Sequence, residues 1–244
     1  MTSALGIDIG GSGMKAAPVD LDRGKTTDDR FRIVTPQPAT PEAMAEVVGE
    51  LVRHFEWTGP VGVGFPGVIQ SGIVRTAANL DPSWVDVDGD GLFTQVSGCD
   101  VVLINDADAA GSAELRFGAG QGERGVVVML TLGTGIGSAI FTDGVLVPNT
   151  EFGHLDMGGM IAEDRASSRA KDEHDLSFEE WGAELERYLL EIEMLFSPNL
   201  VILGGGISKQ FDQFDHYLSQ VRARVVPAKM RNKAGIIGAA LAQA

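Results

Sequence analysis

One pattern occurs twice in this sequence: an apolar strand-like segment, a glycine-rich turn and a second strand-like segment. The first copy has its turn at residues 10–13 and the second at residues 133–135. Residues 7–13 (IDIGGSG) match residues 130–136 (LTLGTGI) in pattern. The repeat predicts an internal duplication, in which two related halves place their glycine hairpins on opposite walls of a cleft.

Short apolar runs and amphipathic stretches alternate along the rest of the chain, which predicts an α/β protein. Thr40 and Pro41 mark a helix start, and Ser177 with Glu180 forms a capping-box pattern at another. The predicted strands cover residues 4–9, 14–19, 31–34, 61–65, 101–104, 126–130 and 200–203, and the predicted helices cover residues 41–55, 107–117, 178–195 and 235–244.

The charge balance argues against broad binding to nucleic acid or to anionic membranes, because 34 acidic and 19 basic residues give a formal net charge of −15. No apolar run approaches the roughly 18 residues that a membrane-spanning helix needs. The single cysteine, Cys99, cannot form an internal disulfide or a thiolate metal cluster and is expected to be buried. The first residues lack a signal-peptide pattern, so a cytoplasmic location is expected.

The first glycine turn combines features that favour phosphate binding. Asp8 lies at a strand edge, and the backbone N–H groups of the glycines and Ser12 can face an anion at close range. A plain β-hairpin is the alternative, but it leaves Asp8 and Lys15 unexplained. The second turn is suited to hold the same phosphate chain from the other side. The candidate phosphate-binding residues are Asp8, Gly10, Gly11, Ser12, Gly13, Lys15, Thr131, Gly133, Thr134 and Gly135.

Asn105 and Asp106 follow an apolar strand directly, at the strand edge where α/β proteins place their sites. A carboxylate there can accept a hydroxyl proton, and the Asn105 amide can bond a second hydroxyl of a polyol. The alternative for Asp106 is a helix N-cap with no chemical role.

A carboxylate and an imidazole, Glu151 and His154, occur three residues apart in a polar loop. Asp156 and Glu163 add only carboxylates, which makes a poor zinc set, so sugar hydroxyls are favoured over a metal. Taken alone, without the neighbouring polar residues, His154 is better explained as a structural residue. Residues 86–91 fit the first half of a calcium loop, but position twelve is Ser97 instead of glutamate, and an acidic turn is expected there.

Five motifs in order along nearly the whole chain resemble the ROK family of sugar kinases, within the actin-like, hexokinase-like ATPase superfamily. These motifs are LGIDIGGSGMK, INDADAAG, TLGTGIGSAIF, PNTEFGH and VILGGGIS. More narrowly, TPQPATP, FPGVI, TAANLDPSW, NDADAAGSAELRFGAG and LVPNTEFGH resemble the family's actinobacterial-type polyphosphate glucokinases, including the polyphosphate/ATP glucomannokinase branch.

The resemblance implies an actin-like/hexokinase-like fold with ribonuclease H-like motifs, in which two duplicated domains surround a cleft. The expected smaller domain covers residues 1–106 and is completed by the helix at 235–244. The expected larger domain covers residues 107–234. The resemblance also implies a homodimer.

The same resemblance implies transfer of a phosphoryl group from polyphosphate or ATP to the 6-hydroxyl of glucose, with Asp106 as general base. Asp8 is implied to orient Mg²⁺ through water, and the two glycine turns to cradle donor phosphates. The implied sugar ligands are Asn79, Asn105, Asp106, Glu151, His154 and Glu163, and the implied nucleotide-binding residues are Gly204, Gly205 and Gly206.

Two departures from the family pattern change these expectations. Residues 155–162 contain no cysteine where many members carry a zinc motif, so structural zinc is not expected. The chain also begins at the phosphate loop without a helix-turn-helix segment, which disfavours DNA binding. The alternatives are a strictly ATP-dependent kinase of glucose, mannose or fructose, and a non-catalytic sugar-sensing module.

The distribution of charge bears on the phosphoryl donor. All 34 acidic residues lie at or before Asp215, and five cations follow with no acid among them. This basic tail is a candidate path for polyphosphate, and a solvated basic face is the alternative. The tail cations are Arg222, Arg224, Lys229, Arg231 and Lys233.

Overall fold

The computed structural model describes residues 2–77 and 80–244. The chain divides into two compact units. The first consists of residues 1–113 and 232–244, and the second of residues 114–231. The domain limits expected from the resemblance, 1–106 and 107–234, stay a prediction. None of the helices in the described ranges is long and apolar enough to cross a membrane.

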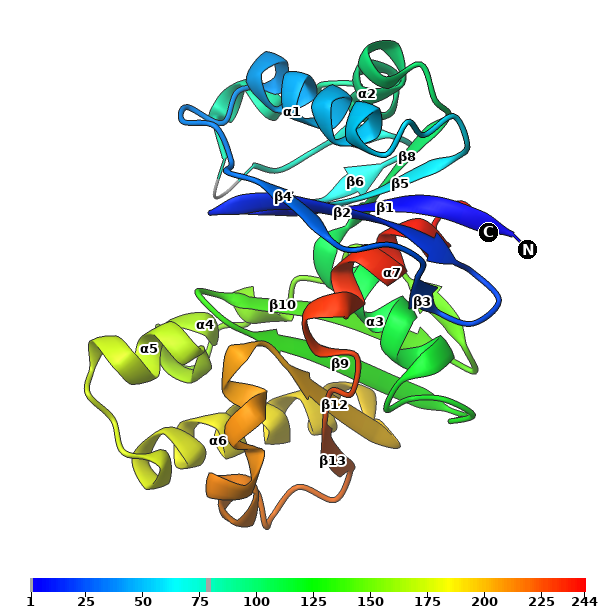
Figure 1. The fold of residues 1–244 in the computed structure, drawn as a ribbon. Helices are drawn as coiled ribbons and strands as arrows, with labels where there is room; N and C mark the ends of the chain where they lie inside the picture. The colour runs from blue at the N-terminus through cyan, green and yellow to red at the C-terminus, as the bar shows by residue number, and fades with distance from the viewer. Residues whose placement is uncertain (1, 78–79) are drawn as a thin grey trace. The chain divides into compact units, whose positions relative to one another are not determined.

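The first unit is built on a mixed sheet with the strand order β3-β2-β1-β5-β8, and β4 also pairs with β2 (Figure 1). β1 and β2 form the hairpin of the first glycine turn, whereas β5 and β8 run parallel to β1. The strands are β1 (Ser3–Gly10), β2 (Gly13–Asp20), β3 (Lys25–Thr26), β4 (Phe31–Ile33), β5 (Val61–Phe65) and β8 (Val101–Asn105), with a separate pair β6 (Ile69–Gln70) and β7 (Ile73–Val74).

Helices cover both faces of this sheet, with α1 (Pro41–His54) and α2 (Gly89–Ser97) on one side and α7 (Ala234–Leu241) on the other (Figure 1). α7 packs directly on the strands at two glycines. A Cβ at Gly6 would lie 1.9 Å from the Ile236 carbonyl oxygen, and one at Gly62 would lie 1.8 Å from that of Ala239. These glycines are therefore required for the close approach of helix and sheet. α3 (Asp106–Phe117) runs from the first unit into the second.

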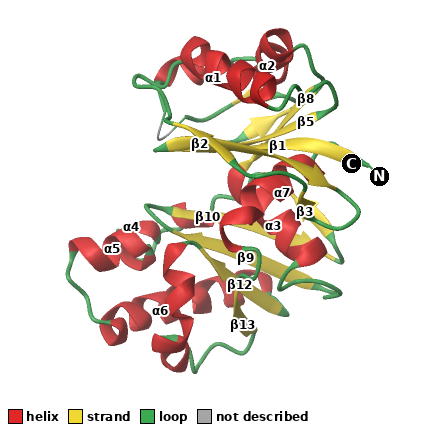
Figure 2. Ribbon diagram, in the orientation of Figure 1, coloured by secondary structure: helices red, strands yellow, loops and turns green. Residues whose placement is uncertain are grey.

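The second unit repeats this strand order as β11-β10-β9-β12-β13 (Figure 2). β9 and β10 form the hairpin of the second glycine turn, and β12 and β13 continue the sheet in parallel with β9. The common order supports the internal duplication read from the glycine turns. The strands are β9 (Val126–Leu132), β10 (Ile136–Thr142), β11 (Val145–Val147), β12 (Leu200–Gly204) and β13 (Arg224–Pro227).

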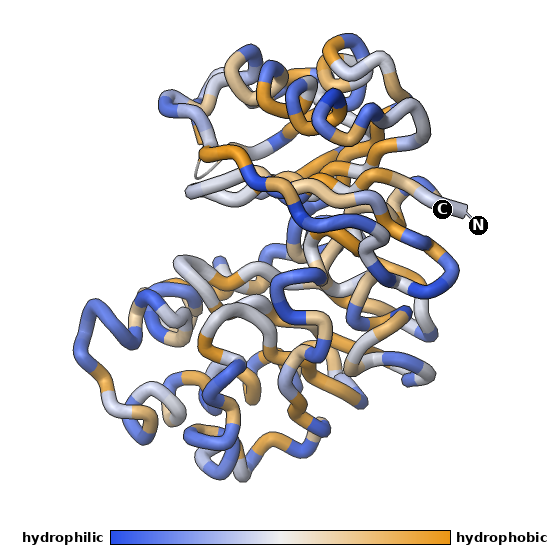
Figure 3. Tube along the Cα trace, viewed as in Figure 1, coloured by the Kyte–Doolittle hydropathy of each residue, from blue (hydrophilic) through white to orange (hydrophobic). Residues whose placement is uncertain are grey.

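The long helix α6 (Phe178–Phe196) buries its apolar stripe against one face of the second sheet. Trp181, Tyr188 and Ile192 from this helix pack with Val128 and Leu130 of β9. The predicted capping box is confirmed, because Ser177 and Glu180 each bond to the other's backbone N–H. Figure 3 shows hydrophobic residues gathered along the strands of the sheet. The shorter helices are α4 (Glu163–Ala166) and α5 (Ser168–Glu173), with 3₁₀ segments η1 (Pro82–Trp84), η2 (Phe152–His154), η3 (Gly206–Gln213), η4 (Asp215–Tyr217) and η5 (Arg231–Lys233).

Several segments differ from expectation. The acidic turn at residues 86–91 is the start of α2, because the Asp88 carboxylate accepts the Gly91 N–H and caps that helix. The segment of α4 and α5 had no predicted helix, and β3, β6, β7 and β13 lie where no strand was predicted. Cys99 is buried as expected, and its burial raises the pKa of the thiol.

Candidate active site

Polar residues meet the carboxyl edge of the parallel strands in the first unit. The register places Asp8 of β1 beside Gly64 of β5, and Gly64 beside Ile104 of β8. Since adjacent strands lie about 4.8 Å apart, the backbones of Asp8 and Ile104 are separated by about 10 Å. Asp106 follows Ile104 by two residues, so Asp8 and Asp106 lie at the same edge of the sheet. The strand between them, β5, carries Gly64 at this level, which has no side chain.

Asp8 has two close neighbours. Its Oδ2 lies 3.4 Å from Lys15 Nζ, and the two residues are direct cross-strand partners. A Cβ at Gly235 would lie 2.7 Å from Asp8 Oδ1, so the first turn of α7 abuts this carboxylate. The positive end of the α7 dipole favours a negative charge at this position.

The first glycine turn is supported from β4 and the residues after it. Thr35, which is buried, donates its hydroxyl to the Gly10 carbonyl at 2.5 Å. Arg32 donates from Nη2 to the Ser12 carbonyl at 2.5 Å, and its Nε lies 2.3 Å from where a Cβ would stand on Gly13. Sequence reasoning missed Arg32, because only the pairing of β2 with β4 brings this residue to the turn.

Asn105 and Asp106 both accept backbone N–H groups at the start of α3, so Asp106 is not the only residue that caps this helix. Asn105 is 6% exposed, and its Oδ1 accepts the N–H groups of Ala107 and Asp108 at 2.9 and 3.0 Å. Its amide nitrogen donates to the Gly67 carbonyl. Asp106 Oδ1 also accepts the Ala107 N–H, at 2.8 Å. Asn105 thus holds the strand end and helix start together, which fixes the position of Asp106, and its predicted contact with sugar stays a prediction.

The carboxylate of Glu163 contacts the second glycine turn. Glu163, at the start of α4, accepts the Ile136 N–H through Oε2 at 3.2 Å, and the same oxygen is 2.5 Å from where a Cβ would stand on Gly135. The Gly133 carbonyl accepts the Arg169 N–H at 3.0 Å, which ties the start of α5 to this turn. The Gly135 position therefore needs a glycine to admit Glu163.

Glu151 lies close enough to His154 and Glu163 for their charges to influence its carboxyl group. Burial raises the pKa of Glu151; the nearby His154 opposes this effect, and the charge of Glu163 adds to it. The Ser138 hydroxyl donates to the Thr150 carbonyl and accepts the Phe152 N–H, which holds the loop that carries Glu151. The predicted sugar ligand Asn79 lies outside the described residues.

Gly204, the last residue of β12, is the register partner of Thr131 on β9. In the first unit, Gly64 on β5 is the register partner of Asp8 on β1, so Gly204 corresponds to Gly64 and Thr131 to Asp8. A pocket of about 860 Å³ lies in the second unit, lined by residues from 118–123, 208–212 and 224–231. It carries the cations Lys209, Arg224, Lys229 and Arg231 and the acids Glu123 and Asp212, and the remaining lining residues are Gly118, Ala119, Gln121, Ser208, Phe211, Val226, Pro227 and Ala228.

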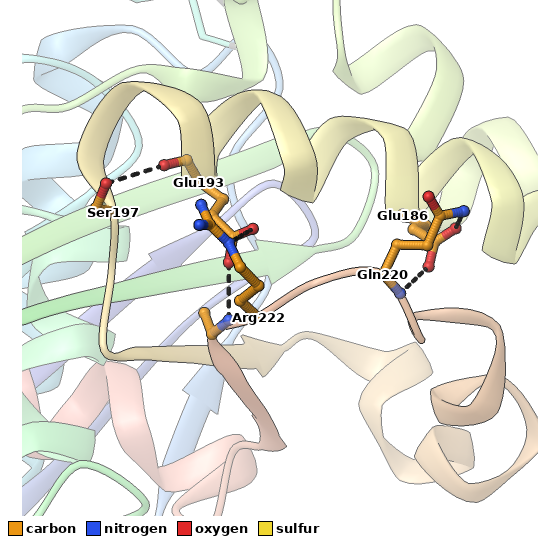
Figure 4. A network of polar contacts seen from close by, with 6 residues as sticks. Glu186, Glu193, Ser197, Gln220 and Arg222 are labelled. Atoms are coloured by element: carbon orange, nitrogen blue, oxygen red, sulfur yellow. Dashed lines mark hydrogen bonds and ion pairs between the residues drawn. The ribbon is translucent and has the colours of Figure 1, made fainter.

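Two of the five tail cations are neutralised by ion pairs. Arg222 Nε lies 3.1 Å from the buried Glu193 carboxylate (Figure 4), and Arg224 pairs with Glu123. The ion pairs found in the described ranges do not include Lys229 or Arg231. Of the three other tail cations, Lys229 and Arg231 line the pocket, whereas Lys233 does not.

The carboxylates and imidazoles of the described residues limit the kind of metal site this chain can form. Within residues 2–77 and 80–244, no group of three His, Cys, Asp or Glu side chains is placed to hold a metal ion. Mg²⁺ bound to phosphates keeps several waters and needs only one or two carboxylates. The partly exposed Asp8 beside the glycine turn fits that need.

The fold and the site define a sugar kinase of the hexokinase-like class. A model of the ROK family matches residues 4–174, and the chain belongs to the ROK family. The polyphosphate glucokinase of Mycobacterium tuberculosis (strain CDC 1551 / Oshkosh) is 50% identical over 239 residues, which cover 98% of this chain and 90% of that protein.

Solved structures agree with this assignment. The inorganic polyphosphate/ATP-glucomannokinase of Arthrobacter sp. strain KM is 51% identical with a TM-score of 0.93, and the match covers 99% of this chain and 98% of that one. A ROK family glucokinase from Streptomyces griseus, solved in complex with glucose and AMPPNP, is 27% identical with a TM-score of 0.82, and the match covers 99% of each chain.

Proposed function

We propose that this protein is a glucokinase that transfers a phosphoryl group from inorganic polyphosphate, and also from ATP, to the 6-hydroxyl of glucose. The observation that carries the kinase chemistry is the placement of Asp8 and Asp106 on one sheet edge beside a glycine turn. The donor is inferred from the two relatives near 50% identity, whose names specify polyphosphate.

In the proposed reaction, the Asp106 carboxylate accepts the proton of the glucose 6-hydroxyl as that oxygen attacks the terminal phosphorus of the donor. The bond between this phosphorus and its bridging oxygen breaks, and the shortened polyphosphate or ADP leaves with the electron pair. Phosphoryl transfer needs little covalent help from the protein, so a placed base and backbone N–H donors supply most of what is required.

Asp8 is the residue proposed to hold Mg²⁺ through water, and the ion, when bound, neutralises charge on the donor phosphates. The backbone of Gly10–Gly13 and Gly133–Gly135 is proposed to bind those phosphates, with Lys15, Thr131 and Thr134 adding side-chain contacts. Gly204–Gly206 are proposed to contact the nucleotide when ATP is the donor.

Glu151, His154 and Glu163 are proposed to bind sugar hydroxyls, together with Asn79 and Asn105. Two carboxylates and an imidazole supply acceptors to several hydroxyls of a polyol. Their mutual influence on the pKa of Glu151 supports a common role.

The basic pocket is proposed to take the far part of a polyphosphate chain. Lys229 and Arg231 support this role, since both line the pocket and neither takes part in the ion pairs of the described residues. The homodimer, the cytoplasmic location and the lack of structural zinc stay predictions.

Identification of the product tests the proposed reaction. Glucose incubated with the purified chain, Mg²⁺ and polyphosphate should give glucose 6-phosphate, recognised by its phosphorus NMR signal and its coupling to the C6 protons. 6-Deoxyglucose is the control and should give no ester. An ester at another position, or one formed from 6-deoxyglucose, contradicts the assigned acceptor hydroxyl.

A further inference from the structure

Charged residues form a row across three neighbouring strands beside the first glycine turn. Asp8 on β1 is the register partner of Lys15 on β2, and Lys15 is in turn the register partner of Arg32 on β4. Direct cross-strand partners project from the same face of a sheet. Asp8, Lys15 and Arg32 therefore lie on one face, and Arg32 is about 10 Å from Asp8 at two strand spacings.

The two cations of this row are in different electrostatic situations. Lys15 is paired with Asp8 at 3.4 Å. Arg32 is exposed, and it takes part in none of the ion pairs found among the described residues. The row therefore carries one positive charge in excess, located on Arg32.

The guanidinium of Arg32 is held in place at the turn. Nη2 donates to the Ser12 carbonyl, and Nε, Nη2 and Cζ all occupy the space next to Gly13 that a Cβ would fill. Only one of the five guanidinium N–H groups is used by Ser12. An immobilised arginine with further donors, next to backbone N–H groups that suit an anion, has the geometry to bind a phosphate oxygen.

We propose that Arg32 binds a phosphate of the phosphoryl donor next to the first glycine turn. The inference rests on the proposed function for the identity of the ligand as a condensed phosphate, which is common to polyphosphate and ATP. The charge and fork of Arg32 add to the backbone donors of residues 10–13, and its contact with Ser12 holds the fork in position.

Initial-rate measurements on Arg32→Gln test this role, with polyphosphate and ATP as separate donors. The KM for each donor should rise about tenfold, because a charge-assisted hydrogen bond is lost. The KM for glucose should stay within about twofold. Arg30→Gln is the matched control, since it removes the same charge from an exposed residue two positions away. A donor KM unchanged by Arg32→Gln, or changed equally by Arg30→Gln, overturns the proposal.

Two further measurements separate binding from support of the turn. Raising the ionic strength should shrink the difference between wild type and Arg32→Gln, because salt screens a lost charge. A difference that is constant with salt indicates a structural role and overturns the proposal. Arg32→Lys keeps the charge and should raise the donor KM less than Arg32→Gln does; an equal increase contradicts the role of charge.

Direct binding measurements and wild-type turnover separate a failure of the Arg32 proposal from a failure of the proposed function. Calorimetric titration with inorganic tripolyphosphate, without glucose, should show weaker binding to Arg32→Gln than to wild type. Wild-type protein that turns over neither donor contradicts the proposed function. Wild-type turnover with a donor KM unaffected by Arg32→Gln contradicts the role of Arg32 alone, and if only ATP is used, the ATP arm still decides it.

Discussion

Asp8 and Lys15 face each other as direct cross-strand partners at the mouth of the first glycine turn, with Oδ2 3.4 Å from Nζ. Both side chains are partly exposed, at 21% and 29%. An ion pair of this kind contributes only about 0–1 kcal/mol to stability. Under the proposed function, a donor phosphate is expected to replace Asp8 as the partner of Lys15 at little cost, which would leave the carboxylate available to Mg²⁺.

Replacement of Asp106 by asparagine should separate chemistry from sugar binding. Asparagine keeps the shape but accepts no proton, so kcat should fall by about 10²–10⁴-fold, while glucose affinity stays within several-fold. Asp22→Asn, an exposed loop position, is the control and should leave kcat unchanged. Steady-state rates and calorimetric glucose titration measure the two effects. Wild-type turnover in Asp106→Asn contradicts the assignment of the base.

Glucose affinity should depend on the protonation of Glu151. Burial raises the pKa of this carboxyl above its ordinary value of 4.5, with His154 opposing and Glu163 adding to the shift. As the pH falls from neutral toward 4.5, the carboxylate takes up a proton and glucose binding should weaken. Titration of glucose without donor measures this, and Glu151→Gln should bind weakly with a flatter pH profile. Identical profiles contradict the role of Glu151.

The same shift has the opposite effect on stability. Because the folded chain binds the Glu151 proton more tightly than the unfolded chain, this group's contribution to the free energy of unfolding is greatest below pH 4.5 and is lost as the pH rises through the folded pKa. Comparison of unfolding for wild type and Glu151→Gln isolates the contribution. A contribution that grows with pH is incompatible with a raised pKa.

Glu114 should be a stability residue of the second unit. Its fully buried carboxylate accepts three backbone N–H groups, from Ala119 at 2.8 Å, Lys229 at 3.1 Å and Met230 at 2.5 Å. Glu114→Gln points an amide donor at one of these N–H groups and should lower the free energy of unfolding by about 1–3 kcal/mol. Denaturant unfolding measures it, against exposed Glu50→Gln as control. Equal stabilities of the two variants argue against this role.

The basic pocket should matter more to polyphosphate than to ATP. The double variant Lys229→Gln/Arg231→Gln should raise the KM for polyphosphate more than that for ATP, with the effect shrinking at high salt. Arg222→Gln/Arg224→Gln removes the same charge from ion-paired positions. It should chiefly lower stability, because the buried Glu193 loses its partner. An equal loss for both donors in the first variant rejects the polyphosphate path.

The sequence patterns predict the fold where they are local. Glycine turns between apolar strands, the Thr40 cap and the Ser177 capping box each act within a few residues, and the corresponding elements are present. α4 and α5 were missed because they are short and largely hydrophilic, with no apolar period over several turns (Figure 3). The sequence predicts only an acidic turn at Asp88, because its role as a helix cap depends on the α2 residues that follow it.

The site was less predictable, because its details depend on residues far apart in the chain. Arg32 reaches the first turn only through the register of β4 with β2. Glu193 and Glu123, which neutralise Arg222 and Arg224, are 29 and 101 positions away from them. Composition identified the basic tail, whereas the fold decides which of its charges are paired.

The central claim is tested most directly by initial rates with glucose and Mg²⁺ in two parallel reactions, one with inorganic polyphosphate free of nucleotide and one with ATP. We expect glucose 6-phosphate to form with polyphosphate as the sole donor, and also with ATP. Turnover with ATP but none with polyphosphate would contradict the account and identify a strictly ATP-dependent sugar kinase.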